Sequence, residues 1–533
     1  MTAILLHYFA NASKQRTSGC HLSHCNLPPK ASRDIGGQNP SHNPAVTLIN
    51  YRRTHLGTNL NMTLAEPPLP SLNTKTKLGY GIGEFSKEIP GSILVFFLLF
   101  FLTNVAGLNP GLAGSVLLIG KTWDAINDPL VGWLSDRTQS RWGRRFPWML
   151  WGAAPLGVSF WLLWLVPPYS AQWQRFGYYS GALILLFTAL TAIAIPHATL
   201  GAELTQTYNE RTQLISFKSA FSIISSILGL VLAQMIFAMG FEAEQRYAIL
   251  GAIIGVIVVI SAYICIWGTY DRYWQMQATR PPAQSVPSLS IGQQFRVAFQ
   301  MQPFWAVMGL YLCSWVGLQT TAAILQYYVI DYMGLAEHHF TQMVLAVQGT
   351  ALVMMIFWSR VGQRIGKRAT YGWGIPLTVI ALLGLFGLQP GQVSGMYGLG
   401  VLAGLGLATA YLVPWSMLPD VIDLDELNTG QRREGIFCGL FVQLQKFGTA
   451  LAIFVVGEIL EQAGYIASSG NKALTITQPD SALWAIRWLV GPIPAIVLVC
   501  GIAIAAVYPI TRHRHQEIVL KLKARKSKEL THG

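Results

Sequence analysis

Apolar stretches long enough to cross a bilayer recur along the chain, separated by short segments of Gly, Pro and charged residues. A membrane-spanning helix needs roughly 20 such residues. The stretches lie near 82–104, 112–134, 146–167, 176–204, 214–240, 246–270, 304–331, 341–359, 370–389, 396–419, 436–463 and 482–508. This pattern predicts an all-α membrane protein with twelve transmembrane helices.

A polar, Pro-rich stretch separates the sixth apolar segment from the seventh and divides the membrane region into two halves of six. Each half has a similar basic loop after its second segment, Gly132–Arg137 with Arg141–Arg145 in the first and Ser359–Arg364 with Lys367–Arg368 in the second. Paired halves are typical of secondary carriers with a central site. We therefore expect two six-helix bundles, at 75–271 and 304–510, joined by a cytoplasmic linker at 272–303.

Residues 1–74 lack a long apolar run and are rich in Asn, Ser, His, Pro and Thr, which predicts a disordered N-terminal tail. Over the whole chain 52% of the residues are hydrophobic and only 11% are charged. A soluble domain carries about 25% charged residues, so this composition indicates an integral membrane protein.

The net charge of +13 comes from 37 Lys and Arg against 24 Asp and Glu. These basic residues cluster in the loops after even-numbered segments, where positive charge marks the cytoplasmic side. We therefore expect no nucleic-acid partner, and we expect a multi-pass protein of the plasma (inner) membrane with both termini in the cytoplasm. The basic tail at 511–533 would lie on that side, next to the lipid bilayer.

Two carboxylates, Asp124 and Asp128, lie four residues apart within the second apolar segment. A charge at the centre of such a segment costs about 2.5–3.5 kcal/mol. Residues at this spacing share one helix face, and two bare carboxylates there repel by about 3 kcal/mol at an effective dielectric of 20. The pair therefore predicts a positive partner: a metal cation, a shared proton or a basic side chain. The first two are typical of ion-coupled transport, and the third of a structural salt bridge.

Several segments resemble the glycoside-pentoside-hexuronide cation symporters (melibiose carrier-like) of the major facilitator superfamily. They are Lys77–Glu88, Trp123–Pro129, Ser140–Trp148 and Pro414–Asp423. The Trp-Asp-x-x-Asn-Asp-Pro pattern in the second is specific to that family, and the resemblance covers about Lys75 to Tyr508. It implies the major facilitator fold, with a central cavity that opens alternately to the two sides.

The resemblance also implies a cation site made of oxygens from the second and fourth helices. The matching residues are Asp124, Asn127, Asp128 and Thr191. Oxygen ligands suit a hard monovalent cation, so sodium is the favoured coupling ion. A proton on one of the two carboxylates is the alternative, because a like-charged neighbour favours protonation. No other cofactor is expected.

Two residues of the expected substrate site follow from the same resemblance. Glu88 matches an acidic residue that binds sugar hydroxyls, and Lys446 matches a lysine that balances the carboxylates when no cation is bound. Two positions depart from the family pattern: Ala194 replaces an acidic residue, and Ser219 replaces an arginine. Lys218, next to Ser219, is expected to reach the same cavity.

Aromatic and charged residues complete the expected sites. Trp415 is a candidate for stacking under a sugar ring, although packing explains a membrane aromatic equally well. A charge network that closes the cytoplasmic gate is expected from residues that a solvated loop would also explain: Asp136, Arg137, Arg141, Asp420 and Arg432.

These features predict cation-coupled uptake of a small molecule, a glycoside or small oligosaccharide. An alternative is a carrier of lysolipids or other amphiphiles with the same fold, because Pro414–Ile422 also resembles animal lysolipid carriers and two sugar-binding charges are missing. An enzyme is not expected, since no nucleophile and base occur together and no Gly-rich phosphate loop is present in the sequence.

Overall fold

The apolar stretches form α-helices, as expected of segments that must pair their backbone groups internally within a bilayer. The computed structural model describes residues 72–205, 208–278, 301–430, 433–467 and 477–532, and these contain no strand. The predicted disordered tail at 1–74 falls almost wholly outside the described residues. The all-α fold predicted from the sequence is confirmed for the described part of the chain.

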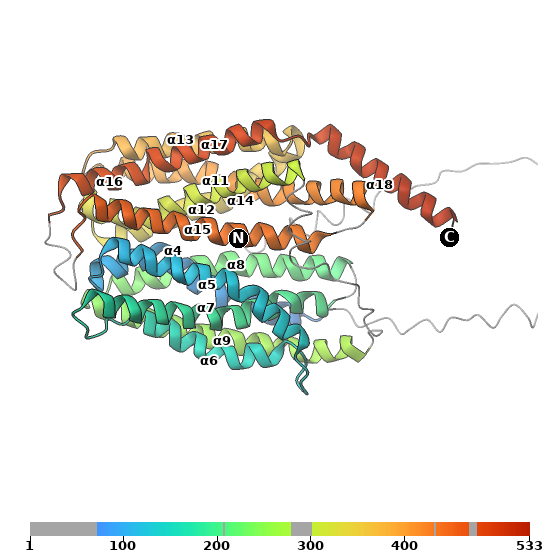
Figure 1. Cartoon of the computed structure of the whole chain (residues 1–533), viewed down its shortest axis with the longest axis horizontal. Coiled ribbons are helices and arrows are strands. Elements are labelled where there is room, and N and C mark those ends of the chain that lie inside the picture. Colours follow the sequence, from blue (N-terminus) through green and yellow to red (C-terminus); the bar gives the residue numbers. More distant parts are fainter. Residues whose placement is uncertain (1–71, 206–207, 279–300, 431–432, 468–476, 533) are drawn as a thin grey trace, which may run out of the picture. The chain divides into compact units, whose positions relative to one another are not determined.

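The first half of the chain forms helices that run side by side (Figure 1). Its first membrane segment consists of three consecutive pieces, two α-helices and a short π-helix. The elements are α3 (Thr74–Ile82), α4 (Phe85–Phe100), η1 (Phe101–Val105), α5 (Pro110–Arg137), α6 (Phe146–Leu163), α7 (Gln172–Glu203), α8 (Tyr208–Phe237) and α9 (Ala243–Ala278).

The second half repeats this plan, and its first segment also ends in a five-residue π-helix. The elements are α11 (Gln302–Tyr327), η2 (Tyr328–Tyr332), α12 (Glu337–Ile365), α13 (Lys367–Gly387), α14 (Val393–Thr429), α15 (Glu434–Gln462), α16 (Asp480–Val490), α17 (Pro492–Val507) and α18 (Arg512–His532). The matching π-helices support the internal repeat that the basic loops indicate.

Among the described residues, eleven segments are long and apolar enough to cross a membrane. The twelfth predicted segment, α5, is 28 residues long, which gives about 42 Å of helix at 1.5 Å per residue. It does not reach the same apolar content because Lys121, Asp124, Asn127 and Asp128 lie in its middle. The least apolar of the twelve segments is therefore the one with the candidate ion site.

The two halves touch mainly through α5 with α15, α4 with α11 and α8 with α12. Figure 1 shows α5 and α15 side by side. Glycines allow them to approach closely, since a Cβ on Gly114 would lie 3.0 Å from the Phe454 carbonyl oxygen and 3.3 Å from the Gly457 Cα. Small residues at such crossings are common in membrane helices. This contact connects the candidate ion site in the first half to the second half.

We call the end of the helices next to the loops at 138–145 and 366 the basic end, and the other the opposite end. At the opposite end, polar side chains join the two halves. Thr103 Oγ1 lies 2.7 Å from the Tyr327 hydroxyl, and the Tyr465 hydroxyl lies 2.9 Å from Asn104 Oδ1 and 2.7 Å from Asp331 Oδ2. All five side chains are buried or nearly so.

Two further contacts join the halves at the opposite end. Arg246 pairs with Glu337 at 2.6 Å, and the Glu461 carboxylate accepts a hydrogen bond from the Gly111 amide at 2.5 Å. A carboxylate at the start of α5 is favourable because helix N-termini carry unpaired amides and partial positive charge.

At the basic end, the ion pairs between described residues lie within one half each. Arg145 pairs with Asp136 in the first half, and Lys367 pairs with Asp420 at 2.6 Å in the second. Helix α9 extends to Ala278, so the first residues of the predicted linker are helical. Residues 279–300 of that linker lie outside the described residues, and its last two residues, Gln302 and Pro303, begin α11.

Candidate functional site

The middle of α5 presents three polar side chains on one face, because residues 124, 127 and 128 are three and four positions apart. Asp124 and Asn127 are buried, and Asp128 is half-buried. Thr191 on α7 faces this group: its hydroxyl lies 3.4 Å from Asp124 Oδ1 and 3.1 Å from Asp128 Oδ1. The structure thus brings Asp124, Asp128 and Thr191 into contact, while the side-chain amide of Asn127, on the same face of α5, donates to the Phe187 carbonyl on α7 at 3.4 Å.

Lys446 on α15 lies between the two carboxylates. Its Nζ is 2.9 Å from Asp124 Oδ2 and 2.5 Å from Asp128 Oδ2. The sequence left three positive partners open for the acidic pair: a metal cation, a shared proton or a basic side chain. In this structure the partner is a basic side chain, that of Lys446. An ammonium held by both acids balances their repulsion, and it links α5 of one half to α15 of the other.

A second lysine, Lys121, lies one helical turn before Asp124 and was not singled out from the sequence. Its ammonium lies 4.6 Å from the centre of the Phe187 ring on α7, a cation–π distance. It interacts electrostatically with Asp124, Asp128 and Lys446. The signal for it was its spacing of three residues from Asp124, which places both on one helix face.

Pro129 explains another contact between α5 and α15. A proline has no amide hydrogen, so the carbonyl four residues earlier, that of Ala125, loses its helical partner. The side-chain amide of Gln443 on α15 donates to this carbonyl. The Asp-Pro pair of the sequence motif therefore creates an open acceptor beside the ion site, and Gln443 fills it from the other half.

The expected substrate residues lie in three separate places in the structure. Glu88 on α4 and Lys218 on α8 interact electrostatically with each other, and Lys87 lies 3.4 Å from Glu88. Trp415 on α14 packs edge-on against aromatic rings of the second half and is 43% exposed. Lys446 belongs to the acidic pair. In the described residues no hydrogen bond or ion pair joins these three groups.

The expected gating residues lie at the basic end. Asp136 pairs with Arg145, while Arg137 and Arg141 stack on Trp133 and Trp142 at 4.1 and 5.1 Å. Asp420 pairs with Lys367 at 2.6 Å and with His515 of α18 at 3.3 Å. Arg432 lies outside the described residues.

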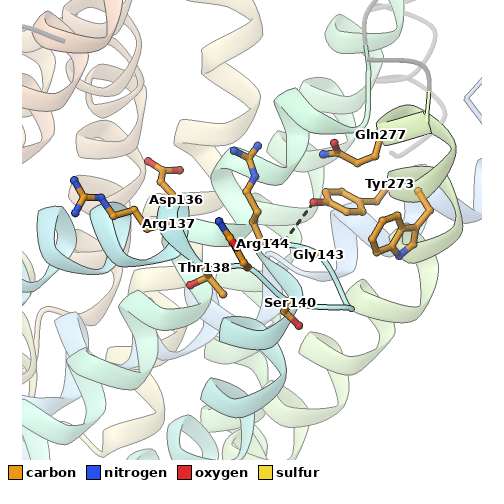
Figure 2. Close-up of a pocket in the computed structure, with 10 residues that line it drawn as sticks. Asp136, Arg137, Thr138, Ser140, Gly143, Arg144, Tyr273 and Gln277 are labelled. Carbon is orange, nitrogen blue, oxygen red and sulfur yellow. Dashed lines mark hydrogen bonds between the residues drawn. The ribbon is translucent and has the colours of Figure 1, made fainter. Parts of the chain in front are cut away.

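A cavity of about 550 Å³ opens at this end of the first half. Figure 2 shows Asp136, Arg137 and Arg144 on one side and Tyr273 and Gln277 on the other. The Arg144 backbone amide donates to the Tyr273 hydroxyl, at 3.4 Å. All of its lining residues belong to the first half, and neither the acidic pair nor Lys446 is among them.

Comparison with known proteins agrees with this architecture. A family model described as "MFS/sugar transport protein" matches residues 79–512. A Synechocystis protein named "Uncharacterized symporter" is 41% identical over 530 residues, covering 85% of this chain and 97% of the relative.

Two other relatives carry more specific names. An Escherichia coli protein, provisionally named glycoside/cation symporter, is 27% identical over 459 residues, covering 85% of this chain and 96% of the relative. A zebrafish (Danio rerio) protein named "Sodium-dependent lysophosphatidylcholine symporter 1-A" is 25% identical over 480 residues, covering 84% and 87%.

Among solved structures, a bacterial homologue of the human lysosomal transporter Spinster, inward-facing and unoccupied, superposes with a TM-score of 0.61. It is 11% identical and covers 84% of this chain and 97% of that chain. At this identity the likeness shows the fold alone, and it confirms the predicted two-bundle architecture.

Proposed function

Because this chain belongs to the MFS/sugar transport family of the major facilitator superfamily, we propose that it takes up a glycoside or small oligosaccharide together with a sodium ion or a proton. The symporter relatives support a co-transported cation and a small-molecule substrate. The proposal involves no covalent step and no cofactor beyond the coupling ion. It places the chain in the plasma (inner) membrane with both termini in the cytoplasm.

One observation carries the proposal: Lys446 spans the two acids at the place where a cation would bind. Asp124 and Asp128 offer carboxylate oxygens, and Asn127 and Thr191 add neutral oxygens, which suits sodium. Sodium and the Lys446 ammonium would compete for the same oxygens, because two cations beside each other repel. Sodium binding therefore displaces Lys446 and breaks one link between α5 and α15.

Competition between sodium and Lys446 couples ion binding to movement of the two halves. Among the described residues, the ion pair of Arg246 with Glu337 and several hydrogen bonds join the halves at the opposite end, whereas the ion pairs at the basic end lie within each half. This pattern corresponds to a carrier open towards the basic end. Release of Lys446 leaves the contact of Gln443 with Ala125 as the nearby polar link between α5 and α15. The halves are then free to tilt about their opposite-end contacts when the substrate also binds.

For the substrate, the first half offers Glu88 and Lys218, and the second half offers Trp415. A carboxylate and an ammonium bind sugar hydroxyls by hydrogen bonds, and an aromatic ring covers the apolar face of a sugar. Asp136, Arg137, Arg141, Asp420 and Arg432 are the proposed gating residues, because ion pairs that are weak singly can be exchanged in each cycle. Binding of ion and sugar would strengthen each other equally by linkage.

A second candidate is transport of a lysolipid or another amphiphile. It is favoured by the name of the zebrafish relative and by Ala194 and Ser219, which replace two charged residues of the sugar site. A thermal-shift screen of the purified chain distinguishes the candidates, since a ligand that binds only the folded state raises its stability. Glycosides, oligosaccharides and lysolipids would each be added with and without sodium.

The transport test uses proteoliposomes with an imposed sodium gradient and the best ligand from that screen. We expect Asp124→Asn and Asp128→Asn to insert normally but to lose gradient-driven accumulation, because each removes a charge that holds the ion. Asp480→Asn, an exposed acid at the start of α16, is the matched control and should accumulate as the wild type does. Sodium-dependent accumulation by both site variants at the wild-type level would reject the assignment.

A further inference from the structure

The first membrane segment is interrupted at Gly83 and Glu84, between α3 and α4. In a continuous helix the Glu84 amide would donate to the Tyr80 carbonyl. Here it donates to the Gly81 carbonyl, at 3.0 Å. The Tyr80 carbonyl is instead contacted by the imidazole of His197 on α7, whose Nε2 lies 2.9 Å away. The break thus provides a backbone acceptor for a histidine from another helix.

Gly83 is what allows the imidazole to come so close. A Cβ at this position would lie 2.5 Å from His197 Nε2 and 2.8 Å from the Cys265 sulfur, closer than real Cβ contacts. The ring of His197 also stacks on the ring of Tyr80, with 4.6 Å between the centroids. The position of the imidazole is therefore fixed from several sides.

The contact with Tyr80 fixes which nitrogen of His197 carries a hydrogen. A carbonyl oxygen only accepts, so Nε2 must be the donor, and in a neutral ring Nδ1 is then a bare acceptor. Nδ1 lies 3.5 Å from Glu84 Oε1, and both side chains are only 1% exposed. Neither atom has a hydrogen-bond partner among the described residues.

An ionised Glu84 and a neutral His197 would therefore leave two buried acceptors facing each other. Each unsatisfied buried polar atom costs about 1–3 kcal/mol. A water bound to both atoms at about 2.8 Å would have to bridge them at an angle far narrower than the tetrahedral angle of its bonds. A proton between the two atoms satisfies both at once.

Charged or titratable side chains from the neighbouring helices face Glu84 and His197. Lys87 Nζ lies 2.9 Å from the other oxygen of Glu84, Oε2, and 3.4 Å from Glu88. Lys218 on α8 interacts electrostatically with both glutamates. The groups that face the pair are Tyr80 from α3, Lys87 and Glu88 from α4, Lys218 from α8 and Cys265 from α9.

We propose that Glu84 and His197 form a proton-binding site in which one proton bridges Glu84 Oε1 and His197 Nδ1 in this conformation. The proton is held either as an imidazolium beside a carboxylate or as a carboxylic acid beside a neutral imidazole. Both forms place a donor between the two atoms. The site lies at the break before α4 and on α7, and it shares no residue with the acidic pair that binds Lys446.

The site has a direct connection to the proposed substrate residue Glu88, and this step rests on the proposed function. Lys87 contacts both Glu84 and Glu88. Loss of the bridging proton makes the site more negative by one charge, whichever of Glu84 and His197 held the proton. The more negative site then draws the ammonium of Lys87 towards Glu84. Glu88 would then lose a partner and be more available to a ligand.

The full-length protein in lipid nanodiscs allows a test that uses neither substrate nor sodium. Nitrogen NMR with ¹⁵N-labelled histidine reports the protonation of each ring nitrogen, and His197→Gln identifies the signal of His197. Infrared difference spectra between the wild type and Glu84→Gln report a protonated carboxyl group. We expect an imidazolium at His197, or an Nε2–H ring with a hydrogen-bonded Nδ1 together with a carboxylic acid band that Glu84→Gln removes.

Two glutamate variants distinguish the site from its surroundings. In Glu84→Gln the amide donates to Nδ1, so His197 should become a neutral Nε2–H ring. In Glu88→Gln, the matched control on the same helix, the wild-type signal should persist. The proposal is overturned if wild-type His197 is neutral with hydrogen only on Nδ1, or is neutral with a free Nδ1 and no carboxylic acid band. Since no transport is measured, these results are independent of the proposed symport.

Discussion

At the scale of single residues, Lys446 decides the charge balance of the proposed cation site. Lys446→Met leaves Asp124 and Asp128 without their shared partner. Removing one member of a buried ion pair costs about 3–5 kcal/mol, and the lower part of that range applies here because Lys446 is 21% exposed. We expect thermal unfolding at a clearly lower temperature in potassium salt, and a large recovery in sodium salt.

Lys367→Met provides the matched control for this prediction. Lys367 also pairs with a largely buried aspartate, Asp420, but away from the proposed cation site. Its destabilisation should be the same in sodium and potassium. If sodium rescues both variants equally, or rescues neither, Lys446 is a structural salt bridge rather than a stand-in for the ion.

At the scale of helices, the pairing of α5 with α15 depends on the carbonyl that Pro129 leaves open. Gln443→Leu removes the donor to the Ala125 carbonyl and should cost about 1–3 kcal/mol, the usual cost of a buried unsatisfied group. In a Pro129→Ala background the helix regains an amide at position 129, so the same substitution should cost much less. Thermal unfolding of the four variants of this double-mutant cycle measures the difference.

Gln445→Leu, two positions along the same helix, is the control for the change in size and polarity. Its effect should be similar with and without Pro129. An equal cost of Gln443→Leu in both backgrounds would show that the amide of Gln443 does not serve the carbonyl of Ala125.

The helices also show what the sequence could predict. Hydropathy located all twelve segments because an apolar run of spanning length has few other uses. It missed the extensions, such as α9 to Ala278, since polar residues continue a helix beyond the bilayer without an apolar signal. It also missed the breaks at Gly83 and at Gly491, because a local loss of helical hydrogen bonds leaves the mean hydropathy unchanged.

The candidate sites likewise divide into features that the sequence predicts and features that depend on how the helices pack. The spacing of Asp124 and Asp128 predicts a shared positive partner, because it depends only on helix geometry. That this partner is Lys446 came from the family resemblance, since the two segments lie far apart in the chain. The pairing of Glu84 with His197 had neither kind of signal: it depends on the break at Gly83 and on how α4 packs against α7.

At the scale of the whole molecule, the polar contacts at the opposite end hold the two halves in the observed arrangement. The Tyr465 hydroxyl lies between Asn104 of the first half and Asp331 of the second. Tyr465→Phe removes the hydrogen bond to Asn104, the one of these two contacts that crosses between the halves. A hydrogen bond between neutral groups contributes about 0.5–1.5 kcal/mol. We expect the population that is open at the opposite end to rise by a factor of about two to ten, since each 1.4 kcal/mol corresponds to a factor of ten.

Distances between spin labels at Ser170 and Gln389, exposed residues at the opposite end of the two halves, would report this population. Tyr332→Phe is the matched control, because its hydroxyl donates to the Leu388 carbonyl within the second half alone. Its loss should leave the distance distribution as it is in the wild type. If the two variants shift the distribution equally, the effect of Tyr465 is a local loosening of the second half. If Tyr465→Phe shifts nothing, the halves are held instead by the contacts of Arg246 with Glu337 and of Gly111 with Glu461.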